Sequence, residues 1–387
     1  MHAPSPSHIL RIHAVDVTVV SFSEDNERLY SGDTSGSVFV TSTRTLRPIA
    51  TWKAHAEGIL SVQEWASSIV THGRDNKLHV WIRVLAPPLV GSTASSPDLP
   101  TPELQYSLDV NALNFCRFSL LCASLSGAES SAASTTERAL IAIPNLIESS
   151  LADVWELPSC SRLHAAIGKV EAPEIGMKSW QIDSDGRILM SLHLFMKSTQ
   201  LHLLSAYEIG EVALRRCISD EHEKTIEGRG WECMWRTRQH AESVMAMTVS
   251  SDASFALTVS ADPIIVRYAL DDGDENRFTK HRVKQPGNGA IALRSDGRVC
   301  VIGGWDGKIR LFSTKSFKSL GTLSFHTKSC QAVAFAHSNP QQSSETSEED
   351  DELTEEERES RSRWLAVGSQ DRRLTIWELI SFRKEAR

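Results

Sequence analysis

Short segments in which apolar and polar residues alternate recur along most of the chain. Four clear examples are VTVVSF at 17–22, ILSVQEW at 59–65, VMAMTVS at 244–250 and QAVAFA at 331–336. Each is followed by a short apolar run ending in small or hydroxyl residues, then by turn residues and a third apolar segment. Alternation with a period of two predicts half-buried β-strands, and the turns between them predict antiparallel pairing.

These strand groups repeat, and the clearest copy runs from His55 through Thr71 and Asp75 to Trp81. A repeat of roughly 40 to 50 residues with this content is typical of a WD40-type β-propeller. The sequence therefore predicts an all-β, seven-bladed WD40 β-propeller that occupies the whole chain as a single domain. Its blades are expected at about 13–53, 54–111, 112–168, 169–238, 239–286, 287–325 and 326–382.

The last blade is incomplete, because it ends after its third strand. The segment HILRIH at 8–13 lies before the first repeat and has the alternation of a strand. We expect residues 8–12 to supply the missing outer strand. This pairing would close the propeller with its two chain ends and leave no sheet edge exposed there.

Four long insertions interrupt the predicted blades, at 86–103, 124–137, 219–230 and 338–363. They are rich in Ser and Pro or in charged residues, so we expect them to be disordered. Each joins either the first and second or the third and fourth strand of its blade. All four are therefore expected at the same end of the sheets.

The net charge of −8 is concentrated in one of these insertions. The segment 345–363 holds ten acidic residues and three arginines, and the rest of the chain is nearly neutral. No basic stripe is present to neutralise phosphates, which disfavours direct nucleic-acid binding. The seven cysteines include no C-x-x-C pair and fit a reducing, cytosolic or nuclear compartment. The sequence also predicts no signal peptide and no membrane span.

The His, Thr and Asp of the clearest repeat resemble the components of a catalytic triad. In a WD40 blade the same residues, with Trp81, form a buried hydrogen-bond network that locks the blade, and this structural interpretation is favoured. The 14 histidines show no metal-ligand spacing, and His72 and His79 are interpreted as packing or hydrogen-bonding residues. No phosphate-binding glycine loop and no nucleophile elbow are present. The sequence thus predicts a protein that is not an enzyme and that has no cofactor and no metal site.

The residue before the turn in each blade is expected to project from the opposite end of the sheets. These residues are Thr34, Arg74, Glu208, Ala261, Trp305 and Gln370. An exposed Trp and an exposed Arg on one rim have the composition of an interaction hot spot. We therefore predict that Arg74, Glu208, Trp305 and Gln370 contact a partner. The alternative is that Trp305 packs over its own turn and that Arg74 pairs locally.

The stretches RPIATWKAHAEGILSVQEW at 47–65 and IVTHGRDNKLHVW at 69–81 resemble the fungal ASTRA-associated protein 1 family of WD-repeat proteins. The resemblance continues through ALIAIPNLIESSLADVWELPS at 139–159, LLSAYEIGEVAL at 203–214 and GSQDRRLTIWEL at 368–379. The family is also similar to the animal G-protein-β-like protein 1.

This resemblance implies a non-catalytic scaffold or adaptor subunit of the ASTRA assembly. The implied partners are RuvB-like AAA ATPases, the co-chaperone for phosphatidylinositol-3-kinase-related kinases and a kinase-like transcription cofactor, with no direct nucleic acid and no membrane. The implied role is chromatin remodelling and maturation of those large kinases, in the nucleus, with the cytoplasm as a second location. The alternative is a WD40 reader of peptides or histone tails, which would bind at the end that carries the turn residues.

Overall fold

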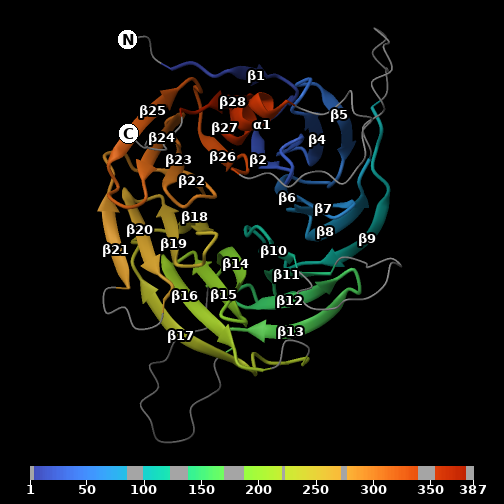
Figure 1. Ribbon diagram of the computed structural model, residues 1–387. Coiled ribbons are helices and arrows are strands. Elements are labelled where there is room, and N and C mark those ends of the chain that lie inside the picture. Colours follow the sequence, from blue (N-terminus) through green and yellow to red (C-terminus); the bar gives the residue numbers. More distant parts are fainter. Residues whose placement is uncertain are drawn as a thin grey trace, which may run out of the picture. The chain divides into compact units, whose positions relative to one another are not determined.

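The computed structural model describes residues 4–84, 99–122, 138–169, 187–219, 223–271, 277–338 and 354–380. Nearly all regular structure in these ranges is antiparallel β-sheet, in seven sheets of four strands each (Figure 1). The predicted fold class, a seven-bladed β-propeller, is confirmed, with one sheet for each blade. The chain divides into two compact units, of which the first holds Met1–Asp75, His79–Ser107 and Gln285–Arg387 and the second holds Asn76–Leu78 and Leu108–Lys284.

The first unit contains four sheets, although the ends of β8 and β9 are grouped with the second unit. Two sheets come from the N-terminal part, with strands β2 (Val17–Phe22), β3 (Arg28–Asp33), β4 (Ser37–Ser42) and β5 (Pro48–Lys53), then β6 (Ile59–Trp65), β7 (Ser68–Gly73), β8 (Lys77–Ile82) and β9 (Leu104–Asp109). Two come from the C-terminal part, with strands β22 (Asn288–Leu293), β23 (Val299–Gly304), β24 (Lys308–Ser313) and β25 (Ser319–Ser324), then β26 (Cys330–Phe335), β27 (Trp364–Ser369), β28 (Leu374–Glu378) and β1 (His8–Leu10).

The second unit contains the other three sheets. Their strands are β10 (Ser119–Cys122), β11 (Ala139–Pro144), β12 (Ala152–Leu157) and β13 (Ser161–Ile167), then β14 (Leu189–Lys197), β15 (Gln200–Tyr207), β16 (Glu211–Cys217) and β17 (Trp231–Arg238), then β18 (Val244–Val249), β19 (Phe255–Ser260), β20 (Ile264–Ala269) and β21 (Phe278–Arg282).

Neighbouring sheets within a unit pack through apolar side chains. In the first unit, Val17 and Leu29 from one sheet lie in the same buried cluster as Ala332 and Ile376 from the next. The second strand of a blade is covered on both faces, and all six residues of β7 and of β23 are buried. This is why the second strands read as continuous apolar runs in the sequence, whereas the first strands alternate.

The N-terminal strand completes the last sheet as predicted. β1 pairs antiparallel with β28, and His8 lies opposite Ile376 while Leu10 lies opposite Leu374. The Glu378 amide also donates to the Ser7 hydroxyl at 3.1 Å. The predicted pairing of the two chain ends is therefore confirmed, and it gives β28 a hydrogen-bonded neighbour on its outer side.

In the third blade the sequence suggests the segment NALNFCRF at 111–118 as the first strand. This interpretation is wrong in position, because the segment is not a strand and β10 begins only at Ser119. The side chain of Asn111 explains the difference, because it bonds to backbone carbonyls of a neighbouring connection and to the Leu113 amide. An Asn side chain that bonds to local backbone in this way competes with a strand ladder.

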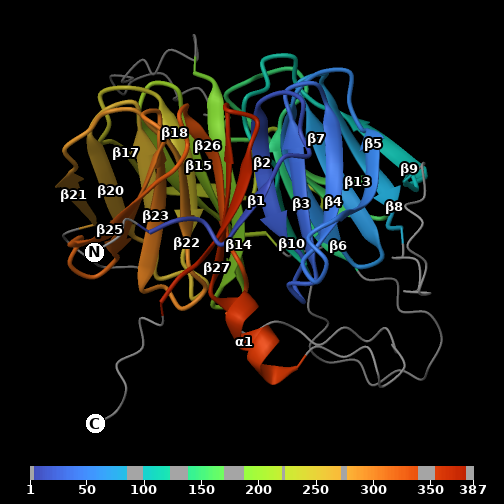
Figure 2. The same cartoon turned by 90° about the horizontal axis from the view of Figure 1, so that it is seen from above.

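Two of the insertions expected to be disordered contain defined structure. Within 338–363, residues 355–362 form the helix α1 (Glu355–Ser362), which stands at the end of its sheet directly before β27 (Figure 2). A capping box of Thr354 and Glu357 starts this helix. No helix among the described residues is both long and apolar enough to cross a membrane.

The insertion at 219–230 is also ordered where it is described. Thr225 forms a parallel bridge with His164 of β13, and its hydroxyl lies 2.9 Å from the His164 Nδ1. The Gly228 amide donates to the Ala165 carbonyl at 2.9 Å. Residues 223–230 therefore cover the outer edge of the third blade, and the prediction of disorder is wrong there.

The other two insertions, at 86–103 and 124–137, lie largely or wholly outside the described residues. The strand order shows which strands the insertions join. They connect β8 to β9 and β26 to β27 in the first unit, and β10 to β11 and β16 to β17 in the second. Within each unit they therefore leave the sheets at one end, as the sequence predicts. We call the other end, where the second and third strands of each blade are joined, the turn end.

Candidate functional site

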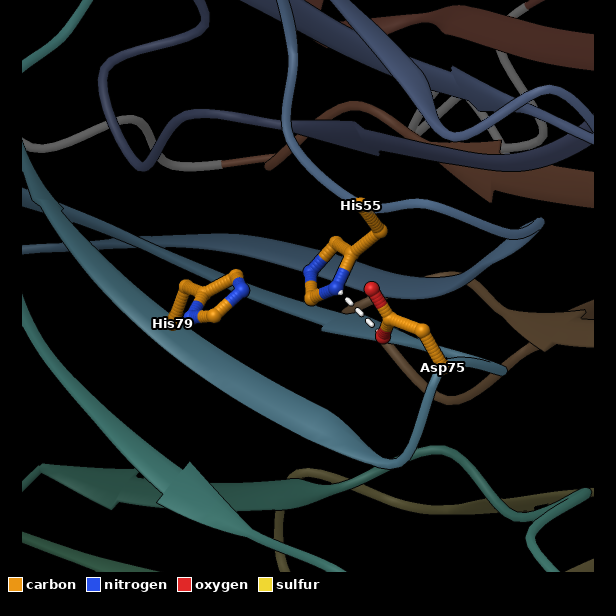
Figure 3. Close-up of side chains that lie close together, drawn as sticks. All are labelled: His55, Asp75 and His79. Carbon is orange, nitrogen blue, oxygen red and sulfur yellow. Dashed lines mark hydrogen bonds and ion pairs between the residues drawn. The ribbon is translucent and has the colours of Figure 1, made fainter.

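Four side chains form a continuous hydrogen-bond network in the blade of β6 to β9. Nδ1 of His55 lies 2.8 Å from a carboxylate oxygen of Asp75, and Nε2 lies 2.8 Å from the Thr71 hydroxyl. Trp81 on β8 donates its indole N–H to the same hydroxyl at 2.8 Å. The structure thus brings together the four residues that the repeat pattern selects, and Figure 3 shows the contact between His55 and Asp75.

The electrostatics of this network favour a neutral histidine beside an ionised carboxylate. Burial lowers the pKa of His55, although Asp75 acts in the opposite direction. Burial alone would raise the pKa of Asp75, but a hydrogen bond from the Ala56 amide and the neighbouring His55 bring it below its usual value. Thr71 is fully buried, so its hydroxyl is not accessible to a substrate. The arrangement joins two strands, the turn between them and the entering loop, and it lacks the exposed nucleophile of a hydrolase.

A second histidine beside this network creates a grouping that superficially resembles a metal site. Ligand atoms of His55, Asp75 and His79 lie within 4.8 Å of one another (Figure 3). The two imidazole rings are stacked, with centroids 4.6 Å apart and planes 19° apart, so their nitrogen lone pairs do not converge on one point. Both ring nitrogens of His55 already have partners, and Nδ1 of His79 lies 2.7 Å from the Ser107 hydroxyl. This geometry is that of hydrogen-bonded packing.

The same network recurs in blades where the sequence pattern is less complete. In the second unit His240 contacts Asp262 and the Thr258 hydroxyl, at 3.0 and 2.8 Å. In the first blade His13 contacts Asp33 at 2.9 Å and Ser31 at 2.8 Å. Asp33 follows Ser31 by two residues, whereas Asp75 follows Thr71 by four, so a fixed-spacing pattern does not identify it.

The last blade places its hydroxyl on a different strand. The sequence pattern puts Val367 at the hydroxyl position of β27, which suggests that the network is lost there. In the structure, His326 contacts Asp371 at 3.0 Å and the Thr375 hydroxyl of β28 at 2.9 Å. Trp377 donates to the same hydroxyl at 3.0 Å. Thr375 lies directly opposite Val367 in the strand register, so the hydroxyl is supplied from the paired strand.

The four residues predicted to contact a partner occupy equivalent backbone positions. The amide of each donates to a carbonyl in the segment that enters the first strand of the same blade, and Thr34 does the same. These hydrogen bonds are Thr34 to Asp16, Arg74 to Gly58, Trp305 to Gly287 and Gln370 to Ser329 in the first unit, and Glu208 to Ile188 in the second. All of them lie at the turn end of their unit.

Trp305 both packs locally and remains accessible. One face of its indole covers the backbone of Gly287 and Gly289, where an added Cβ would lie 2.8 and 3.0 Å from ring atoms. The side chain is nevertheless 49% exposed. The neighbouring Asp306 is held by Arg310 at 2.5 Å. The local contacts therefore cover one face of the indole and leave about half of the residue accessible to a partner.

Comparisons with known proteins point to one family along the whole chain. The WD domain, G-beta repeat family matches residues 4–42, which cover β1 to β4. ASTRA-associated protein 1 of Verticillium alfalfae is 31% identical over 402 residues, covering 97% of this chain and 93% of the relative. The protein of the same name in Penicillium rubens is 29% identical over 97% of both chains. The one in Schizosaccharomyces pombe is 24% identical over 98% of this chain and 100% of its own length.

Proposed function

The chain belongs to the ASTRA-associated protein 1 family, and from this premise we propose that it is a non-catalytic scaffold or adaptor subunit of the ASTRA complex. The observation that carries the proposal is the match over 97% of the chain to relatives whose name states that association. A WD40 propeller fits this role, because its blades supply a rigid surface for other proteins. The buried hydrogen-bond networks support a role without catalysis, since their hydroxyls and histidines are engaged in holding strands together.

The proposal extends to the function and location of the assembly. We assign the protein a part in chromatin remodelling and in the maturation of phosphatidylinositol-3-kinase-related kinases, acting in the nucleus. Its proposed partners are the co-chaperone of those kinases, RuvB-like AAA ATPases and a kinase-like transcription cofactor. The family resemblance is the support for these assignments.

Within this proposal, Arg74, Glu208, Trp305 and Gln370 contact a partner protein. Their support is the shared position at the turn end of each unit and the outward indole face of Trp305. Large aromatic and Arg side chains are the residue types that dominate protein interfaces when they become buried.

The test is quantitative affinity purification of the tagged chain from the organism that encodes it, followed by mass spectrometry. The wild-type chain is compared with an Arg74→Ala/Trp305→Ala variant whose folding is verified by circular dichroism and thermal unfolding. The matched control is Phe278→Ala/Arg282→Ala, which removes an equally exposed aromatic and an exposed Arg from the outer strand β21.

We expect wild type and control to recover ASTRA components and the Arg74→Ala/Trp305→Ala variant to recover fewer. Equal recovery by all three would leave the adaptor function standing and would contradict the contribution of Arg74 and Trp305. Failure of the wild-type chain to recover any ASTRA component would contradict the adaptor function. Binding of isolated peptides or histone tails, with no folded partner, would favour the reader alternative.

A further inference from the structure

An exposed apolar cluster lies at the turn end of the third blade, in the second unit. Two neighbouring segments form it, and we call it the blade-three patch. Its members are Leu113, Phe115, Leu146 and Ile147, which are 52%, 41%, 51% and 86% exposed. Single exposed apolar residues are ordinary, but a group gathered on adjacent segments marks an interaction site in a soluble protein.

Buried asparagines hold the two segments together. Asn111 donates through its side-chain amide to the carbonyls of Asn145 and Leu146, at 2.9 and 3.2 Å. Asn145 accepts from the amides of Ile147 and Glu148 at 3.0 Å each. Both asparagines are less than one-tenth exposed. The polar groups of the connection are therefore turned inward, and the apolar side chains are left facing solvent.

A buried carboxylate fixes this arrangement to the sheet. Asn145 donates to Asp153 on β12 at 2.8 Å, and the Ala166 amide of β13 donates to the same oxygen at 2.8 Å. The backbone of the patch is thus held by hydrogen bonds before any partner arrives. Such preorganisation lowers the entropic cost of binding, because a loop that is already ordered loses less conformational freedom than one that becomes ordered on binding.

Two carboxylates flank the patch. Glu148 follows Ile147 directly, and Glu208 lies at the turn end of the adjoining blade. The two positions are linked through residues 188–189, because the Leu189 amide donates to Ser149 and the Glu208 amide donates to Ile188. Both glutamates are exposed, and neither has an ion-pair partner among the described residues.

From these observations we propose that the blade-three patch docks an amphipathic segment of a partner protein, with large apolar side chains flanked by Lys or Arg. The apolar side chains of the segment would cover Leu113, Leu146 and Ile147, and its basic side chains would pair with Glu148 and Glu208. The proposal rests on the adaptor function proposed above and names the surface through which one partner is held. Charge complementarity of this kind steers association and selects among partners that share an apolar face.

The first experiment places a photo-reactive benzoylphenylalanine at position 147 of the full-length chain in cells and maps the cross-links by mass spectrometry. The same amino acid at position 226, which is 62% exposed at the opposite end of the second unit, is the positional control. The second experiment measures partner recovery by Leu113→Asp/Ile147→Asp, against Ile218→Asp/Ile226→Asp as a matched pair of exposed apolar residues. A third variant, Glu148→Lys/Glu208→Lys, tests the charges and leaves the apolar side chains intact.

We expect position 147 to cross-link to a partner segment with at least two large apolar residues and neighbouring Lys or Arg. Recovery of that partner should fall at least about tenfold in Leu113→Asp/Ile147→Asp and should be unchanged in its control. Glu148→Lys/Glu208→Lys should also weaken recovery, and added salt should then raise the residual binding, because it screens the new repulsion between like charges.

Three results would overturn the proposal. The first is cross-links only within one chain or to a second copy of it. The second is a mapped segment without basic residues, and the third is equal recovery by the patch variant and its control. The proposed function is judged separately, because it depends on whether the wild-type chain recovers ASTRA components by any surface. A wild-type chain that recovers them with an unaffected patch variant would contradict only the docking proposal.

Discussion

Removing the Thr375 hydroxyl should destabilise the last blade strongly, although it lies outside the usual repeat pattern. The variant Thr375→Val keeps the shape of the side chain and leaves two buried groups without their partner, Nε2 of His326 and the indole N–H of Trp377. A buried polar group that loses its hydrogen bond costs about 1–3 kcal/mol, so two of them cost about 2–6 kcal/mol. This is a large part of the roughly 5–15 kcal/mol that stabilises a typical domain.

The strand register allows a rescue experiment. Val367 faces Thr375 across the β27–β28 pair and occupies the position at which Thr71 supplies the hydroxyl in the second blade. In Thr375→Val/Val367→Thr the hydroxyl moves back to the second strand, and we expect at least half of the lost stability to return. Val367→Thr alone should be destabilising, because it buries a second hydroxyl beside partners that are already engaged.

The assay is equilibrium unfolding in urea, followed by tryptophan fluorescence and circular dichroism, with all four members of the double-mutant cycle. Hydrogen exchange of the β27 and β28 amides gives the local readout, because parts of a protein can open separately from the whole. Thr322→Val on β25 is the control, since it makes the same change at an exposed position. A Thr375→Val effect below about 0.5 kcal/mol, the range of ordinary surface substitutions, would refute this reasoning.

Three further predictions follow from the buried histidines, the Trp305 support and the N-terminal strand. Burial lowers the pKa of His72 to about 3 and of His164 to about 4, so both are neutral in the folded protein but protonate below pH 6.5 when it unfolds. Stability should therefore fall as the pH drops from 6.5 towards 4, by about 2 kcal/mol per histidine at pH 5, and urea titrations of His164→Gln should show a shallower dependence. Gly287→Ala should displace the indole of Trp305, because Gly287 has a φ of +80° and an added Cβ would lie 2.8 Å from the ring. Its fluorescence spectrum should shift relative to that of the control Gly321→Ala, where an added Cβ meets nothing within 4 Å. Identical spectra would contradict the prediction. Deletion of residues 1–12 should accelerate hydrogen exchange in β28 but not in β20, and equal protection of β28 in both proteins would exclude a stabilising role for β1.

The fold could be predicted from sequence because its signals are local. Alternation in the first strands and apolar runs in the second strands reflect burial on one face or on two, and β2, β6 and β26 lie within a residue of the alternating segments. The helix α1 was also readable, since Thr354 and Glu357 have the spacing of a capping box. The prediction of disorder for 338–363 came from the high charge of the whole segment. A composition averaged over so many residues does not show one short capped helix within it.

Some site residues can be recognised from their spacing in the sequence, whereas the role of others depends on how the strands pair. The set of His55, Thr71 and Asp75 has the spacing of the family pattern, so it could be predicted along one chain. Thr375 could not, because its role depends on the register that sets it opposite Val367. The members of the blade-three patch were missed for a related reason. Leu113 and Phe115 belong to a largely apolar segment that suggests a strand, and only the contacts of Asn111 show that the segment is held as a connection.

The third blade shows why a weak repeat signature does not imply a weak blade. Its sequence lacks the His, hydroxyl and Asp of the hydrogen-bond network found in other blades. Buried hydrogen bonds of Asn111, Asn145 and Asp153 nevertheless connect the corresponding elements, namely the entering loop, the turn and the third strand. Here the Asn111 side chain bonds directly to the carbonyls of Asn145 and Leu146, so the two connections are held side by side. Leu113 and Ile147 on these connections are exposed. The polar groups that replace the recognisable pattern therefore also hold the proposed docking surface in place, which links the irregularity of this blade to the proposed binding role and not to loss of structure.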